Sequence, residues 1–228
     1  MKKEKLYIFD TTLRDGAQTQ GVDFSLDDKE KISVALDNLG VDYIEGGWPG
    51  ANPTDTEFFQ KKHNFKNAKL TSFGMTKKTG RSSDNDPGLS ALTNSNTTSI
   101  CLVGKSWDFH VDIALGISKE ENLENIRESA KHFIKKDKEF MFDAEHFFDG
   151  FKANSKYAVA CLKAAFDEGA RWIVLCDTNG GTLPHEISKI VEEVSNVIPG
   201  KNLGIHAHND TGNAVANTLA AVLAGARQ

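Results

Sequence analysis

Residues 6–16 read LYIFDTTLRDG, and this stretch decides between two kinds of α/β fold. Its apolar run, residues 6–9, is typical of a buried strand that ends at Asp10. In an open nucleotide-binding sheet, a glycine-rich phosphate turn directly follows the first strand. Here the loop reads DTTLRDG and has its first glycine at Gly16. The stretch therefore favours a barrel over an open, doubly wound sheet.

The rest of the chain repeats the same unit of apolar run, polar loop and amphipathic helix. The first helix is expected to begin after the N-cap Ser25 and to stop at Gly40, because apolar side chains recur between them at helical spacing. Alternating strands and helices imply parallel strands, since each strand must return to the same end of the sheet through a crossover. We expect strands near residues 6–9, 41–45, 70–73, 99–103, 140–143, 172–176 and 203–206, and further helices at 55–62, near Leu89, and at 118–136, 154–168, 184–197 and 210–224.

Polar residues follow nearly all of these strands. Side chains at many strand ends that converge on one mouth are typical of a (β/α)8 barrel. We therefore predict an α/β fold of the TIM (β/α)8 type, with residues 1–228 as a single catalytic domain. A complete barrel needs an eighth strand, so the last βα unit is expected to be missing from this chain. The polar strand-end residues are Arg14, Asp15, Glu45, Asp143, Glu145, Asp177, Thr178, His206 and His208.

Composition narrows the possible functions. The 228 residues include 27 Lys and Arg against 32 Asp and Glu, interspersed along the chain, so a nucleic-acid binder is not expected. The longest apolar runs are far too short to cross a bilayer, and we expect a cytoplasmic protein without membrane contact. Three widely spaced cysteines among apolar neighbours, Cys101, Cys161 and Cys176, are predicted to be reduced core thiols.

The most specific local motif is HAHND at residues 206–210. In an extended strand, residues i and i+2 point to the same side, so His206 and His208 can reach one ion. Asp15, just past the first strand, can add a hard oxygen ligand. Two nitrogens and a carboxylate suit a divalent ion that acts as a Lewis acid. The alternative is a pair of histidines that only bond nearby loops.

Three other residues are candidates for chemistry, each with a structural alternative. Arg14 could steady an oxyanion beside the metal, or it could form an ordinary salt bridge. Glu145 could enter a substrate pocket or be a solvated loop carboxylate. Thr178 could bond a substrate carboxylate or only close a turn. Neither a G-x-S-x-G motif nor a Walker lysine occurs, which disfavours covalent acyl transfer and nucleotide hydrolysis.

Two motifs separated by most of the chain carry a family resemblance. Residues 9–18, FDTTLRDGAQ, and residues 204–210, GIHAHND, together resemble the signature of the DRE-TIM metallolyase superfamily. That superfamily holds isopropylmalate, homocitrate and citramalate synthases and hydroxymethylglutaryl-CoA lyase. Residues 45–53, 104–111 and 145–150 resemble the citramalate synthase branch in particular.

The resemblance implies roles for individual residues. It implies that Asp15, His206 and His208 bind a divalent ion, namely Mn, Mg or Zn, and that Arg14 stabilises an enolate or alkoxide oxygen. It places Glu145 and Thr178 in a keto-acid pocket, with Thr178 holding the carboxylate. Two further residues are assigned by the same resemblance: Asp143, where relatives vary a pocket residue, and Gln18, which would orient the first loop.

The resemblance also implies an activity. The expected reaction joins acetyl-CoA to the 2-oxo acid pyruvate and releases citramalate and CoA, in branched-chain amino-acid biosynthesis, by a homodimer. Lys105 and Arg81 are candidates for contact with CoA phosphates. An isopropylmalate or homocitrate synthase stays open as the alternative enzyme, and a metal-binding but inactive fragment or pseudoenzyme as the alternative without catalysis.

Overall fold

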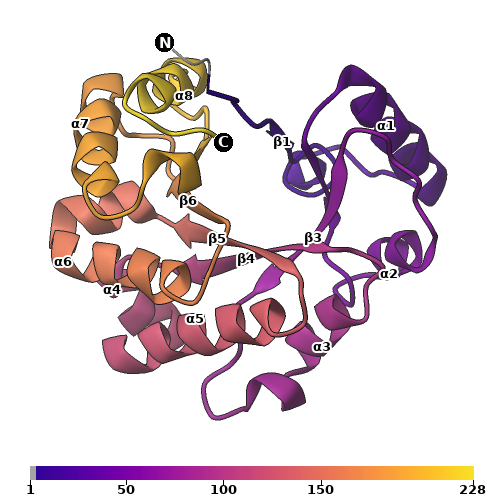
Figure 1. The fold of residues 1–228 in the computed structure, drawn as a ribbon, viewed down its shortest axis with the longest axis horizontal. Helices are drawn as coiled ribbons and strands as arrows, with labels where there is room; N and C mark the ends of the chain where they lie inside the picture. The colour runs from indigo at the N-terminus through magenta and orange to yellow at the C-terminus, as the bar shows by residue number, and fades with distance from the viewer. Residues whose placement is uncertain (1–3) are drawn as a thin grey trace.

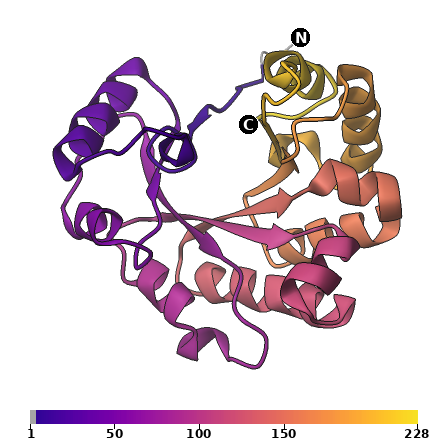
Figure 2. The same cartoon turned by 180° about the vertical axis from the view of Figure 1, so that it is seen from behind.

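The computed structural model describes residues 4–228, and within this range seven parallel strands form one curved sheet (Figure 1). The strands lie in chain order, each paired in parallel with the next. Helices surround the outer side of the curve in both views (Figures 1 and 2). The strands are β1 Phe9–Asp10, β2 Tyr43–Gly47, β3 Lys69–Met75, β4 Ser99–Lys105, β5 Glu139–Glu145, β6 Trp172–Asp177 and β7 Leu203–Ala207.

The helices follow the predicted order. Ser25 and Asp28 form the capping box of α1 (Leu26–Leu39), and Gly40 ends this helix at φ 89°, a left-handed conformation that suits glycine. The remaining α-helices are α2 Pro53–Gln60, α3 Pro87–Thr93, α4 Asp108–His110, α5 Lys119–Ile134, α6 Phe147–Phe166, α7 Pro184–Ser195 and α8 Ala214–Leu223.

Two helical segments differ from the prediction. Residues 108–115, which were assigned to neither helix nor strand, form α4 followed by a π-helix over Val111–Leu115. The predicted helix 154–168 overlaps α6, which begins and ends earlier and has a break at Asn154, where φ is −152° and ψ is 79°. The Asn154 side chain accepts a hydrogen bond from the backbone N–H of Tyr157, so this residue caps the second part of α6.

The first strand is shorter than residues 6–9 suggested. Only Phe9 and Asp10 form β1 in register with β2, whereas Ile8 contributes its carbonyl to the N–H groups of Asp42 and Tyr43. The polar side chain of Asp42 in turn accepts from the N–H of Ile8 at 2.9 Å. The chain is therefore held to β2 before the regular ladder begins.

The last two residues lie between β7 and the segment that precedes β1. Arg227 donates its backbone N–H to Leu203 at 2.9 Å and accepts from Tyr7 at 2.7 Å. Gln228 accepts from Ile205 at 2.9 Å. These bonds bring the N-terminal and C-terminal segments together (Figure 1). The fold is TIM-like α/β, and in the described residues the barrel has seven strands, as predicted.

Strand alternation builds two hydrophobic layers and positions the polar residues. Side chains that point into the barrel form an inner layer, whereas their neighbours pack outward against the helices. Polar residues follow two positions later along the chain, and by the same alternation they face the inner side. They are Glu45 after Tyr43, Asp143 after Met141 and Thr178 after Cys176. The inner layer consists of Tyr43, Phe73, Cys101, Met141, Trp172, Val174 and Cys176.

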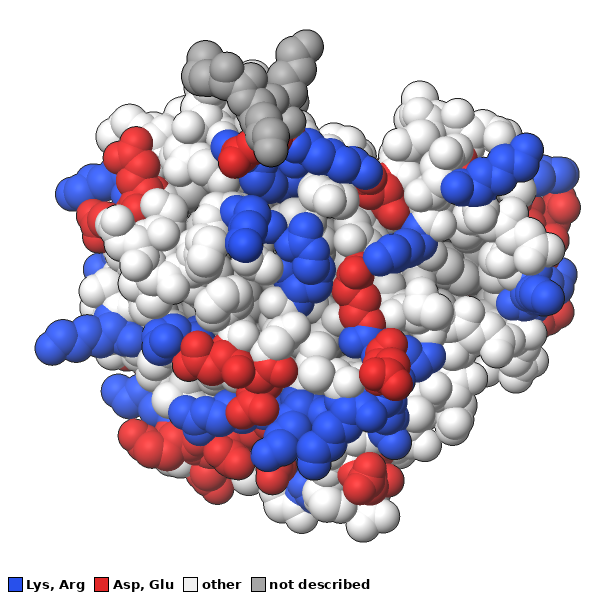
Figure 3. Space-filling model, viewed as in Figure 1, with Lys and Arg blue, Asp and Glu red and all other residues white. Residues whose placement is uncertain are grey.

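The distribution of surface charge and the state of the three cysteines are as the sequence predicted. On the face drawn in Figure 3, lysine and arginine side chains are interspersed with aspartate and glutamate. The cysteines Cys101, Cys161 and Cys176 are all buried and free of disulfides. Among residues 4–228, none of the helices has the length and apolar character needed to cross a bilayer.

Candidate active site

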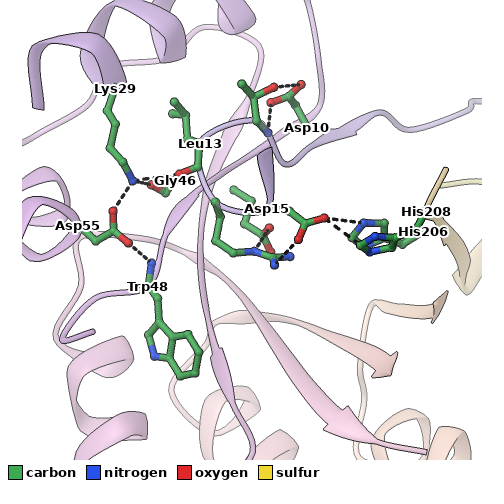
Figure 4. Close-up of polar contacts among 12 residues, drawn as sticks. Asp10, Leu13, Asp15, Lys29, Gly46, Trp48, Asp55, His206 and His208 are labelled. Atoms are coloured by element: carbon green, nitrogen blue, oxygen red, sulfur yellow. Dashed lines mark hydrogen bonds and ion pairs between the residues drawn. The ribbon is translucent and has the colours of Figure 1, made fainter. Parts of the chain in front are cut away.

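Asp15, His206 and His208 converge at the carboxyl ends of β1 and β7 (Figure 4). Oδ2 of Asp15 lies 3.2 Å from Nε2 of His206 and 3.7 Å from Nε2 of His208. The two imidazole rings are nearly parallel, with centroids 5.0 Å apart, because residues two apart on a strand point to the same side. One donor atom from each residue lies within 4.8 Å of the other two.

The charges of this cluster prepare it for a cation. The hydrogen bond from His206, together with the charge of Arg14, lowers the pKa of Asp15 to about 2 despite partial burial, so the group is a carboxylate at neutral pH. Burial alone would lower the pKa of His206, but Asp15 and Asp143 raise it above its ordinary value. The three side chains are half-buried and keep a solvent-facing side, which leaves room for substrate or water.

Arg14 is inserted between this cluster and the barrel interior. Its Nε donates to Oε2 of Glu45 at 2.7 Å, and its Nη1 donates to Oδ1 of Asp15 at 3.0 Å. The guanidinium carbon lies 3.9 Å from the centre of the Phe73 ring. Burial disfavours the charged form, but Glu45 and Asp15 outweigh it and raise the pKa of Arg14. Arg14 thus forms a buried ion pair with Glu45, a structural salt bridge of the kind that the sequence left open.

Two acidic residues lie beneath this arginine. Glu45 and Asp143 are buried inside the barrel, and a carboxylate oxygen of each lies within 4.8 Å of the other and of the Cys101 sulfur. Burial raises the pKa of both carboxyl groups. Oε1 of Glu45 has no hydrogen-bond partner in the described protein. The sequence placed Glu45 among the strand ends without a role; an acidic residue inside the buried strand β2 was the available signal.

Glu145 and Thr178 belong to a second group at the ends of β4, β5 and β6. Glu145 forms an ion pair with Lys105, its register partner on β4, and both side chains are half-buried. The hydroxyl of Thr178 accepts from the backbone N–H of His146 at 2.8 Å. His146 has a left-handed backbone, with φ 54° and ψ 35°. The turn after β5 is therefore held by Thr178.

Gln18 is the least constrained of the predicted site residues. It is exposed and ends a 3-10 helix, Gly16–Gln18, that follows Asp15. It lines a cleft of about 460 Å³ together with Arg14 and Trp48. The structure thus brings Arg14, Asp15 and the two histidines into one cluster with Asp143, and it leaves Gln18 at the rim.

Lys29 is a buried residue near the site, and no feature of the sequence marks it as one. It projects from α1 and bonds the carbonyl oxygens of Leu13 and Gly46 and the carboxylate of Asp55 (Figure 4). A lysine within an amphipathic helix gives no signal of burial, because most lysines of this kind are solvated.

Comparison with known proteins identifies the family. The HMGL-like family matches residues 5–228. An (R)-citramalate synthase of Aquifex aeolicus is 56% identical over 227 residues, which make up 99% of this chain and 43% of that protein. The 2-isopropylmalate synthase 1 of Caldanaerobacter subterraneus is 34% identical over 232 residues, covering 100% of this chain and 57% of that protein. The chain thus spans less than two thirds of either relative.

The comparison with solved structures agrees with the fold. The hydroxymethylglutaryl-CoA lyase of Pseudomonas aeruginosa superimposes with a TM-score of 0.81 at 19% identity, over 98% of this chain and 74% of that one. The predicted resemblance to the metallolyase superfamily is confirmed by the family match and by the citramalate and isopropylmalate synthase relatives. The chain belongs to the HMGL-like family.

Proposed function

We propose that this chain is a catalytic domain that condenses acetyl-CoA with pyruvate to give citramalate and free CoA, in the biosynthesis of isoleucine and related amino acids. The observation that carries the proposal is the convergence of Asp15, His206 and His208 from opposite ends of the chain. The 56% identity to a citramalate synthase supports the choice of reaction.

Asp15, His206 and His208 fit a divalent ion. One carboxylate oxygen and two imidazole nitrogens within 4.8 Å of one another are donors that Mn²⁺, Mg²⁺ and Zn²⁺ accept to different degrees. When bound, such an ion supplies Lewis acidity that polarises the carbonyl of a 2-oxo acid. The ionised state of Asp15 at neutral pH favours this role.

Arg14 would stabilise negative charge on the reacting oxygen. A base takes a proton from the methyl group of acetyl-CoA, and the resulting enolate attacks the ketone carbon of pyruvate, which forms a carbon–carbon bond and turns the C=O bond into an alkoxide. The alkoxide then takes up a proton, and water cleaves the thioester C–S bond to release CoA. The guanidinium is kept charged by Glu45 and Asp15, and its nitrogens are fixed in place before substrate arrives. Preorganised donors of this kind contribute about 3–4 kcal/mol to transition-state stabilisation.

Thr178 and Glu145 would complete the pocket for the 2-oxo acid, with Asp143 on its inner wall and Gln18 at its rim. Because the Thr178 oxygen already accepts from His146, its single proton is free to be donated to a substrate carboxylate. Glu145 forms an ion pair with Lys105. We propose Glu145 as a catalytic residue at the open end of the pocket.

Acetyl-CoA would approach from the side of β3. A cleft of about 720 Å³ is lined there by Trp48, Met75 and the basic residues Lys78 and Arg81. Lys78 and Arg81 are exposed and can contact phosphate groups, in line with the expectation for Arg81. Lys105, the other candidate, is engaged by Glu145 and is therefore the weaker one.

Turnover of two 2-oxo acids by the complete protein tests the function. Release of free CoA thiol is measured with acetyl-CoA and a divalent ion, in the presence of pyruvate or 2-oxoisovalerate. Faster release with pyruvate supports citramalate synthesis. Faster release with 2-oxoisovalerate supports the alternative, a 2-isopropylmalate synthase, to which the 34% identical relative points. Bound metal without thiol release would indicate an inactive metal-binding protein.

The setting of the reaction is also part of the proposal. We expect residues 1–228 to act as one catalytic domain, the protein to form a homodimer, and the reaction to take place in the cytoplasm. Its partners would be small molecules, not nucleic acid or membrane.

A further inference from the structure

A buried lysine joins the loop that carries Arg14 to strand β2, which carries Glu45. The side chain of Lys29 is 5% exposed, although α1 is otherwise an outer helix of the barrel. Its ammonium lies 3.0 Å from the carbonyl oxygen of Leu13 and 2.8 Å from that of Gly46, and it forms an ion pair with Asp55. An ammonium has three protons, so each of them has an acceptor here.

The two carbonyl groups occupy special positions in the chain. Leu13 directly precedes Arg14, and Gly46 directly follows Glu45. Arg14 and Glu45 are themselves joined at 2.7 Å. Lys29 therefore holds the backbone on both sides of this pair, one residue away from each partner (Figure 4).

Asp55 extends the same connection along the loop after β2. Its Oδ2 accepts from the backbone N–H of Trp48 at 2.8 Å and from Nδ2 of Asn52 at 3.0 Å. The chain passes close to this carboxylate at Gly47, where φ is 139° and a Cβ would lie 2.5 Å from Cγ of Asp55. The loop is thus shaped around the carboxylate that balances Lys29.

Stability alone is a weak reason for such an ion pair. Desolvation of a buried pair often cancels its attraction, and packed apolar side chains of similar size can serve as well or better. What the ammonium adds is directional bonding to two backbone carbonyls at once, which an apolar side chain lacks. Such bonds fix the positions of the two backbone segments relative to one another.

We propose that Lys29, balanced by Asp55, is a positioning residue that fixes Arg14 against Glu45 and so aims the guanidinium at the reacting oxygen. The inference rests on the proposed function, in which Arg14 stabilises that oxygen. Lys29 does not touch substrate and acts only through the backbone next to Arg14 and Glu45.

The test compares two variants of the complete protein. Lys29→Met leaves the Asp55 charge buried and unpaired, whereas Lys29→Met/Asp55→Asn removes both charges and keeps the side-chain shapes. The double variant is expected to melt at a higher temperature than the single one, yet both should lose kcat about 100-fold, as for a misplacement of about 1 Å, with little change in the KM for pyruvate. If the double variant regains kcat along with its melting temperature, Lys29 only stabilises the fold and the inference is wrong.

Lys31→Met is the matched control, because Lys31 lies on the same helix and pairs with an aspartate, Asp27, at an exposed site. It should keep the kcat of the wild type. Crystal structures supply a readout that does not depend on activity: the hydrogen bond between Arg14 and Glu45 should be lost in the double variant and kept in Lys31→Met. An Arg14–Glu45 distance that stays at 2.7 Å in the double variant would overturn the inference. Absence of condensation by the wild type would count against the proposed function alone.

Discussion

Asp15 and His206 are 191 positions apart in the sequence, and their side chains lie 3.2 Å apart. Such a contact requires that the first and last strands of the sheet curve toward one another. It also means that the cluster forms only when the whole curved sheet is folded, so the site and the fold share the same determinants. Arg14 joins this contact to the barrel interior through Glu45.

Removal of one imidazole should abolish metal binding. In His208→Ala, Asp15 and His206 supply only two protein ligands, and a stoichiometric ion should no longer be retained after dialysis. Elemental analysis of the purified protein measures this. His185→Ala, at an exposed position on α7, is the control and should keep its metal. Full metal content in His208→Ala would remove His208 from the ligand set.

Glu145→Gln should reduce turnover without loss of metal. The substitution removes the ion pair with Lys105 while keeping the size of the side chain, and kcat should fall about 100-fold because the pocket that this pair organises is disturbed. Glu139→Gln is a matched control, since Glu139 begins the same strand, pairs with Lys69 and is similarly half-buried. Equal kinetics of the two variants would argue against a catalytic role for Glu145.

Thr178→Val should affect both stability and substrate binding. The backbone N–H of His146 would lose its acceptor, at a cost of about 1–2 kcal/mol in the free energy of unfolding. The proton for the substrate carboxylate would be lost too, so the KM for pyruvate should rise. Thr178→Ser keeps the hydroxyl and should restore both quantities. An unchanged KM in Thr178→Val would show that Thr178 stabilises the turn after β5 and does not bind the substrate carboxylate.

The pH dependence of stability can be tested at Asp37, far from the metal ligands. Its carboxylate accepts three backbone N–H bonds, from Lys66, Asn67 and Ala68, at 2.8–2.9 Å. Burial raises the pKa of Asp37, but these bonds lower it more, so the net shift is downward. A depressed pKa stabilises the fold fully above the ordinary value for Asp, about 3.9, and the effect is lost as the pH falls through the lower folded-state pKa.

Asp37→Asn should therefore lower the free energy of unfolding by about 2 kcal/mol at pH 7. The difference from the wild type should shrink as the pH falls below about 4. Denaturant unfolding at several pH values measures both effects. Asp167→Asn, at an exposed position, should change stability little. A difference that does not depend on pH would show that the charge of Asp37 is not the source of the stabilisation.

Much of the fold could be predicted from local pattern. Hydrophobic runs located the strands, capping residues located helix ends, and the alternation of side chains along a strand was enough to put His206 and His208 on one side. Strand length was less accessible, because β1 depends on pairing with β2 and not on its own sequence. The helical turns of residues 108–115 are too short to show a periodic pattern, so the sequence gives no signal for them.

The parts of the site that sequence reasoning missed depend on tertiary burial. Lys29 has the sequence environment of a solvated helix lysine, and its burial follows from the positions of Leu13, Gly46 and Asp55. Likewise, Glu45 on β2 and Arg14 in the loop after β1 are 31 positions apart, and their pairing depends on how the fold brings these two segments together. Neither contact produces a periodic pattern in the sequence from which it could be predicted.

The proposed reaction depends on one divalent ion bound jointly by Asp15, His206 and His208. Crystals of the complete protein, grown with Zn²⁺ and measured at the zinc absorption edge, test it directly. We expect an anomalous peak about 2.0–2.2 Å from one oxygen of Asp15 and one nitrogen of each histidine. Absence of a peak at this site, or a peak bound by other side chains, would contradict it.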